Sequence, residues 1–147
     1  MIYLGADHRG FQLKEQVKNY LAGKGRQVND LGTNSQAPVD YPVVAEKVAK
    51  KVVRDEEGRG ILICGSGAGV CVAANKINGV RATEGWNKQA IEAARNDDDV
   101  NVLCLAADML ALDEARELIE VFLDTPFAGE ERQKRRLKEI GDIESDN

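Results

Sequence analysis

The sequence contains no apolar run long enough to span a membrane, and its first residues lack the basic and apolar regions of a signal peptide. Basic residues are not in excess either, because 20 Lys and Arg stand against 25 Asp and Glu, a net charge of −5. This balance argues against a general nucleic-acid or membrane-binding surface. Three cysteines (Cys64, Cys71 and Cys104) form an odd set without close pairing, as in reduced cytosolic proteins. We therefore expect a cytoplasmic protein without nucleic-acid or membrane partners.

The chain also lacks both common nucleotide-binding motifs. The glycine-rich stretch 65–69 (Gly-Ser-Gly-Ala-Gly) has Val70 where a dinucleotide fingerprint requires its third glycine, and it lies in mid-chain. No Gly-Lys-Ser/Thr ending of a nucleoside-triphosphate loop is present. A dehydrogenase is therefore the least favoured enzyme class.

The glycine-rich stretch is nevertheless the most informative part of the chain. Residues 60–63 are a short apolar run typical of a buried strand, and a helix is predicted from Val70 to Lys76. The glycines then form a strand-to-helix turn, whose free backbone N–H groups favour an anion. Cys64, at the end of the strand, would face this positive helix end, which favours a reactive thiolate. The alternative is that Cys64 is only a small apolar residue in the core.

Short apolar runs and amphipathic segments alternate along the rest of the sequence. We predict strands at 2–6, 27–31, 60–63, 80–83 and 101–105, with helices at 11–21, 42–53, 70–76, 86–95, 112–123 and about 129–140. This order indicates one α/β domain over 1–147, with a five-stranded parallel sheet covered on both faces as an α/β/α sandwich. Ligands of such sheets bind at the carboxyl ends of the strands. We expect Asp7 and His8, the turn after Cys64, and the loop leading to Asp97 to converge there.

The remaining candidates each have a structural alternative. Asp7 could transfer a hydroxyl proton or cap the following helix. His8, the single histidine, could contact a ligand or be a hydrogen-bonded loop residue. Arg132 and Arg136, at i and i+4, could clamp one phosphate or belong to a solvated basic face. Cys71 and Cys104 are expected to be packing residues.

Taken in order, these segments resemble the ribose-5-phosphate isomerase B family, whose relatives include the galactose-6-phosphate isomerase subunits. The resemblance covers about residues 2–144. The stretches that carry it are Gly5-Ala6-Asp7-His8-Arg9-Gly10, Gly32-Thr33, Asp40-Tyr41-Pro42, Ile63-Cys64-Gly65-Ser66-Gly67-Ala68-Gly69, Ala74-Asn75-Lys76, Gly79-Val80-Arg81-Ala82, Asp99-Val100-Asn101-Val102-Leu103, Arg132 with Arg136, and Ile140-Gly141-Asp142-Ile143-Glu144.

The resemblance implies a Rossmann-like sheet and a homodimer, possibly paired into a tetramer, with the active site at the interface. It implies cofactor-free and metal-free isomerisation of ribose 5-phosphate to ribulose 5-phosphate, a reaction of the pentose phosphate pathway. Cys64 would be the base, and Ser66 with the N–H groups of Gly65, Gly67, Ala68 and Gly69 would hold the enediolate oxygen. Asp7 would move the hydroxyl proton and His8 would contact the sugar. Arg132 and Arg136, on a helix at about 129–143, would reach the phosphate from the other subunit.

Three acidic residues depart from the family pattern. Asp97 stands where the family usually has a histidine credited with opening the furanose ring, Asp98 replaces an asparagine, and Asp108 aligns with an arginine that helps to position the phosphate. We assign Asp97 to the ring-opening step and Asp98 to substrate binding. The acidic replacements keep two alternatives open: isomerisation of a tetrose or hexose phosphate, and a non-catalytic sugar-phosphate-binding protein.

Overall fold

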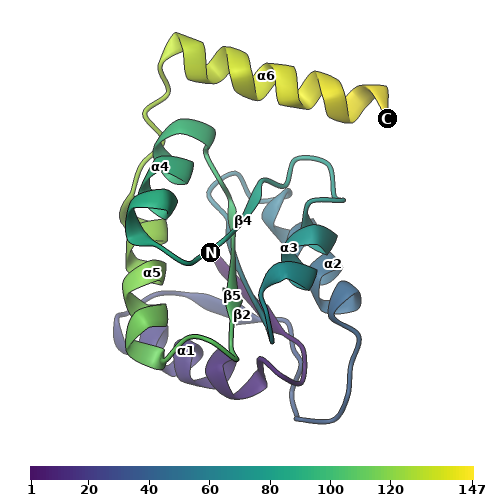
Figure 1. Cartoon of the computed structure of the whole chain (residues 1–147), viewed down its shortest axis with the longest axis vertical. Coiled ribbons are helices and arrows are strands. Elements are labelled where there is room, and N and C mark those ends of the chain that lie inside the picture. Colours follow the sequence, from purple (N-terminus) through teal and green to yellow (C-terminus); the bar gives the residue numbers. More distant parts are fainter.

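The computed structural model describes all residues from 1 to 147. Its strands are β1 (Ile2–Ala6), β2 (Val28–Asp30), β3 (Arg59–Cys64), β4 (Ala82–Glu84) and β5 (Val102–Ala106). Its helices are α1 (Phe11–Gly23), α2 (Tyr41–Val52), α3 (Ala68–Ala74), α4 (Lys88–Asp98), α5 (Leu112–Asp124) and α6 (Glu131–Asp146). The five strands form one parallel sheet in the order β2-β1-β3-β5-β4, which confirms the predicted α/β/α sandwich (Figure 1). None of the helices combines the length and the apolar character needed to cross a membrane.

The two central strands are buried on both faces, which explains their continuous apolar sequence. Successive side chains of β3 point to opposite faces of the sheet. Ile61 and Ile63 pack in the core formed with α1, α4 and α5, whereas Leu62 and Cys64 pack in the core formed with α2 and α3. Figure 1 shows these two helical layers on either side of the sheet. The Cys64 side chain is thereby placed on the face covered by α3.

Several predicted boundaries shift in the structure. Helix α3 begins at Ala68 rather than Val70, and β4 starts at Ala82, where it pairs with Val102 of β5, rather than at residue 80. Helix α4 begins at Lys88, after Asn87 accepts a hydrogen bond from the Ala90 N–H (3.1 Å).

Helix α4 also continues to Asp98 instead of ending at Arg95, so part of the acidic run lies in its last turn. The buried Arg95 explains this extension, because it donates to Asp99 Oδ1 (2.8 Å) and to the Val100 carbonyl oxygen (2.7 Å). The positive charge of Arg95 in the last turn also stabilises the helix, because it interacts favourably with the negative end of the helix dipole.

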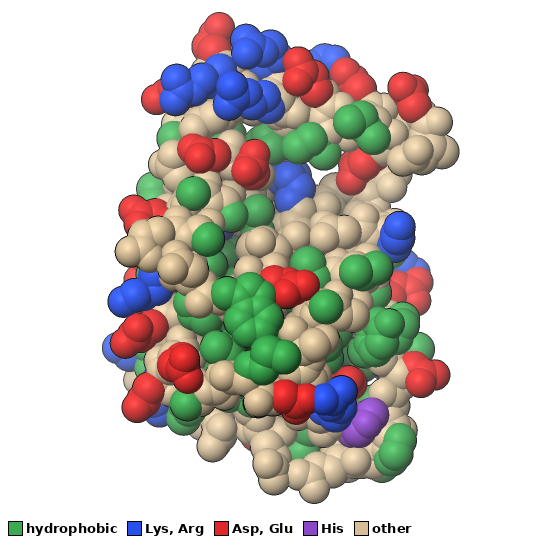
Figure 2. Space-filling view, viewed as in Figure 1, with side chains coloured by type: hydrophobic (Ala, Val, Ile, Leu, Met, Phe, Trp, Pro, Cys, Tyr) green, Lys and Arg blue, Asp and Glu red, His purple; other side chains and the backbone are tan.

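Helix α6 lies apart from the two layers, across the amino ends of the strands (Figure 1). It is held near its start by Gln133, its only buried residue, and near its end by Glu144, which accepts two 3.1 Å contacts from the Gly79 N–H. Figure 2 shows Lys and Arg side chains gathered over this helix. Ile140 and Ile143 are exposed on it, so α6 presents both charge and apolar surface to solvent.

Candidate active site at the turn after β3

The turn after β3 holds the Cys64 sulfur against backbone donors. The Gly67 N–H donates to Cys64 Sγ at 3.2 Å, an interaction that suits a thiolate as acceptor. Gly67 has a φ of 77°, a left-handed conformation that glycine adopts without steric cost. Cys64 itself is only 4% exposed, so the sulfur lies at the bottom of the turn.

The same turn leaves several backbone donors unused. The N–H groups of Gly65, Ser66 and Gly69 donate to no acceptor within the chain, whereas the Ala68 N–H is taken by Ser66 Oγ at 3.3 Å. Gly69 lies beneath the ring of Tyr41 from α2, where a Cβ atom would come within 2.8 Å of the ring. Unused N–H groups around a glycine turn form a concave site for a negatively charged oxygen. The predicted anion-binding turn therefore has its donors in place.

Asp7 and His8 lie at the carboxyl end of β1, the strand next to β3. Asp7 is 5% exposed, and its Oδ1 accepts the N–H groups of Arg9 and Gly10, each at 3.0 Å. Asp7 Oδ1 therefore closes the turn that precedes α1 and does not cap the helix, whose N-cap residue is Gly10 without a side-chain hydrogen bond. Oδ2 remains unoccupied by the chain. His8 Nδ1 lies 3.2 Å from the backbone nitrogen of Val39 and 3.3 Å from its carbonyl oxygen, so the tautomer decides whether it accepts or donates there. His8 is thus oriented by the long loop between β2 and α2.

Asp108 follows β5, on the other side of the glycine turn. Its N–H donates to the Gly65 carbonyl oxygen (3.0 Å), and the Ala107 N–H donates to that of Cys64 (2.9 Å). The Asp108 carboxylate forms an ion pair with Arg9. Sequence reasoning had not singled out Arg9, although it lies in the stretch Asp7-His8-Arg9-Gly10.

The expectation that Asp97 joins this end of the sheet is wrong for a single chain. Helix α4 starts near the carboxyl ends of the strands and returns the chain to the amino end of β5. Its last residues therefore lie at the amino ends of the strands, opposite Cys64. Asp97 Oδ1 accepts a hydrogen bond from Gln133 Nε2 of α6 (3.1 Å). Asp97 and Asp98 therefore share their location with α6 rather than with Cys64.

Arg132 and Arg136 also lie at the amino ends of the strands, on the exposed surface of α6. Arg132 is 61% exposed and pairs with Glu130 at 3.3 Å, whereas Arg136 has no ion-pair partner in the chain. Within one chain these arginines do not meet the glycine turn.

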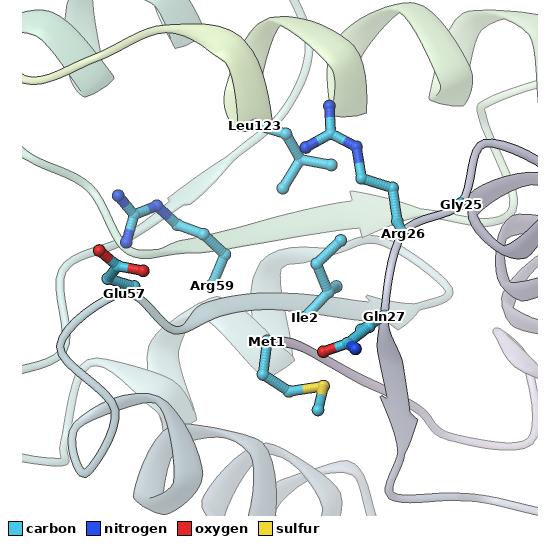
Figure 3. A pocket seen from close by; sticks show the side chains of 8 residues that line it. All are labelled: Met1, Ile2, Gly25, Arg26, Gln27, Glu57, Arg59 and Leu123. Carbon is cyan, nitrogen blue, oxygen red and sulfur yellow. The ribbon is translucent and has the colours of Figure 1, made fainter.

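The largest cavity, about 360 Å³, opens at the amino ends of the strands and contains none of the predicted site residues. Figure 3 shows Arg26 and Arg59 on opposite sides of it, with their guanidinium groups well separated. Burial lowers the pKa of Arg59, and repulsion from Arg95 lowers it further. Arg26 is engaged by Asp124 at 2.7 Å. The two arginines therefore do not converge on one ligand, and we do not assign this cavity to the active site.

The other two cysteines differ from Cys64 in environment. Burial raises the pKa of the Cys104 thiol well above its ordinary value. A hydrogen bond with the Cys104 thiol lowers the pKa of Cys71, which is half-buried on α3. No group of three or more His, Cys, Asp or Glu side chains is arranged to hold a metal ion.

The comparisons with known proteins agree with this fold. A family model described as ribose/galactose isomerase matches residues 2–140. Ribose-5-phosphate isomerase B of Escherichia coli is 37% identical over 134 residues, which cover 91% of this chain and 90% of that protein.

Solved structures extend the likeness to three dimensions. The structure of ribose-5-phosphate isomerase B from Clostridium thermocellum matches with a TM-score of 0.93 at 38% identity, covering 99% of this chain and 97% of that chain. The Mycoplasma genitalium enzyme, solved with bound ribulose 5-phosphate, matches with the same score, identity and coverages. Because the family model and the relatives span almost the whole chain, this protein belongs to the ribose/galactose isomerase family.

Proposed function

We propose that this chain is an aldose–ketose isomerase that converts ribose 5-phosphate to ribulose 5-phosphate through an enediolate. One observation carries the proposal: the Cys64 sulfur lies in a turn with three unused N–H donors, beside the buried Asp7. Relatives named ribose-5-phosphate isomerase B at 32–40% identity support the substrate class.

The proposed chemistry needs a base, donors for a developing oxyanion and a group that moves one hydroxyl proton. Cys64, as thiolate, removes the proton from C2 of the aldose and returns it to C1. The free N–H groups of the turn stabilise the negative charge on the carbonyl oxygen, and each such donor is worth about 3–4 kcal/mol. Asp7 moves the proton from the C2 hydroxyl to the oxygen on C1 through its free Oδ2. The step is balanced, because the substrate gains one proton at C1 and one on the C1 oxygen for the two that it loses, even where the thiol has exchanged its proton with solvent.

We further propose that each active site is shared between two subunits of a homodimer. The glycine turn and Asp7 would come from one subunit, whereas Arg132 and Arg136 of the partner subunit would bind the phosphate. The location of α6 supports this arrangement, because its arginines are exposed and lie at the amino ends of the strands, whereas Cys64 lies at a carboxyl end. The exposed Ile140 and Ile143 also favour packing of α6 on a second copy.

A tetrose phosphate is the second candidate substrate. Asp97 accepts hydrogen bonds from Gln133 and Asn96 (3.1 and 2.8 Å), so the residue in the ring-opening position is already engaged within its own chain. A four-carbon aldose phosphate stays open-chain and requires no ring opening. The acidic Asp97 and Asp98 are then compatible with turnover.

The function is tested by proton NMR of aldose phosphates incubated with the protein in D₂O. We expect conversion of ribose 5-phosphate with one deuteron incorporated at C1 of the ketose, because the base exchanges its proton with solvent. Erythrose 4-phosphate and a hexose 6-phosphate, run in parallel, rank the alternative substrates. A protein that binds these sugars but leaves every carbon-bound proton in place would be a non-catalytic binding protein, and the proposal would fail.

The shared site predicts complementation between two inactive variants. Cys64→Ala and the double variant Arg132→Ala/Arg136→Ala, co-expressed with different tags, yield hybrid dimers that can be isolated on both tags. One of the two sites in a hybrid then has all its residues, so we expect about half of the wild-type activity per dimer. Hybrids as inactive as the parent homodimers would show that the arginines act within their own chain or not at all.

A further inference from the structure

The carboxyl end of the sheet carries a single basic side chain. Five segments follow the strands at this end: residues 7–10, 31–40, 65–67, 85–87 and 107–111. Arg9 is the only Lys or Arg in all of them, whereas Asp7, Asp40 and Asp108 are acidic. A phosphorylated sugar that approaches Cys64 from this side therefore meets one cation and several carboxylates.

The structure holds Arg9 in place over the glycine turn. Its guanidinium lies so close above Gly65 that a methyl group on this glycine would overlap it. The ion pair with Asp108 fixes it there, and Asp108 is itself tied to the turn by its N–H bond to the Gly65 carbonyl oxygen (3.0 Å). Arg9 nevertheless remains 57% exposed. The cation is thus fixed relative to Cys64 and open to solvent.

A guanidinium has five N–H donors, and a carboxylate occupies at most two of them. In Arg9 only the Nη2 group contacts Asp108, so Nε and Nη1 are free to donate. A planar group with two free donor nitrogens is suited to phosphate oxygens, which accept such charge-assisted bonds well.

We propose that Arg9 binds the substrate phosphate at the entrance to the glycine turn, with Asp108 as the residue that positions it. This inference rests on the proposed function and extends it to a specific binding residue. Arg9 belongs to the same subunit as Cys64. It supplies a cation that the α6 arginines of that subunit cannot supply, because they lie at the opposite end of the sheet.

The experiment is steady-state kinetics of Arg9→Gln with ribose 5-phosphate. We expect KM to rise about 10- to 100-fold, as for the loss of a charge-assisted hydrogen bond, while kcat changes less than about threefold. The inhibition constant of inorganic phosphate, used as a competitive probe, should rise in parallel. Arg9→Lys, which keeps the charge without the planar donors, should fall between wild type and Arg9→Gln.

A double variant separates phosphate binding from mere neutralisation of Asp108. Arg9→Gln leaves the Asp108 carboxylate unpaired, whereas Arg9→Gln/Asp108→Asn restores a neutral pair. If Arg9 binds phosphate, KM of the double variant stays at least about fivefold above wild type, because the cation is still missing. A return of KM to the wild-type value would overturn the proposal.

Arg26→Gln is the matched control, because Arg26 is also an arginine that reaches solvent and pairs with a carboxylate, Asp124, at the opposite end of the sheet, although it is only partly exposed. Its KM should equal that of wild type, and equal thermal midpoints establish that all variants are folded. If wild type isomerises ribose 5-phosphate and Arg9→Gln leaves KM and phosphate inhibition unchanged, this inference fails and the function stands. If wild type has no turnover, calorimetric binding of inorganic phosphate decides: weaker binding by Arg9→Gln supports the inference, and equal or absent binding overturns it.

Discussion

Replacing Cys64 by alanine is expected to lower kcat for aldose–ketose conversion by about a thousandfold or more, because a positioned general base contributes up to about 10⁴-fold. The remaining structure should change little. Cys64 is small, its backbone is held by β1, β5 and the turn, and its removal vacates only the volume of one sulfur atom. The measurement is single-turnover and steady-state kinetics, together with the incorporation of solvent deuterium. Both readouts should fall together, since both require removal of the carbon-bound proton.

Two further variants make this result specific. Cys64→Ser retains the shape and a hydrogen-bond acceptor for the Gly67 N–H but replaces the thiol by a much weaker acid, so it should be nearly as inactive as alanine. Cys71→Ala is the matched control, because Cys71 lies on α3 outside the turn. Substitution is preferable to alkylation, since the hydrogen bond with Cys104 lowers the pKa of Cys71 and alkylation would not distinguish this half-buried thiol from Cys64. Turnover by Cys64→Ala within tenfold of wild type would rule out the thiol as base.

The fold could be predicted from the sequence because periodicity and burial agree in most elements. In α2, Val44, Ala45, Val48 and Ala49 recur at helical spacing, and all are buried against the sheet. The continuous apolar run at residues 61–63 corresponds to a central strand covered on both faces. One boundary error lies at α4, where buried Arg95 pairs with Asp99 and the helix continues three residues beyond its predicted end.

The site could be predicted only in part, because sequence order does not state at which end of the sheet a residue lies. The glycine turn follows strand β3 directly, so the local sequence pattern alone predicts that it lies at the carboxyl end of the sheet. Asp97 lies in the last turn of helix α4 and does not follow a strand, so it is found at the amino ends of the strands with α6. Arg9 was missed although a signal existed: it is the single cation in five segments that follow the strands.

The burial of Lys14 was missed for a different reason. Hydrophobic periodicity predicts which apolar residues are buried, but it does not predict that a charged residue is buried among them. Lys14 lies beside Leu13 and Val17 on the inner face of α1, and its side chain is 0% exposed. Its ammonium group donates to Asp30 Oδ2 at 2.6 Å, a carboxylate that also accepts from Lys18 at 2.8 Å. Asp30 ends β2, so this cluster fastens α1 to the edge strand.

Asp30→Ala is expected to lower the free energy of unfolding by about 3 kcal/mol, because it leaves the Lys14 ammonium buried with only Glu15 nearby at 3.4 Å. Lys14→Met should cost much less, since an apolar chain of similar length needs no counter-charge and Asp30 keeps Lys18 and the Gly32 N–H as partners. Urea unfolding measures both. Glu46→Ala, which removes a solvent-exposed partner of Lys50, is the control and should leave the free energy of unfolding almost unchanged. Equal losses in the two core variants would contradict this account.

The same cluster predicts a pH dependence. Burial by itself raises the pKa of Asp30, but hydrogen bonds from Lys14, Lys18 and the Gly32 N–H outweigh it, and the pKa lies below its ordinary value. A carboxyl group whose pKa is lower in the folded than in the unfolded chain contributes stability above the unfolded pKa of about 3.9. That contribution is lost as the pH falls through the folded pKa. The stability difference between wild type and Asp30→Ala should therefore be constant near neutrality and shrink below about pH 4, because protonation removes from wild type the charge that the variant already lacks.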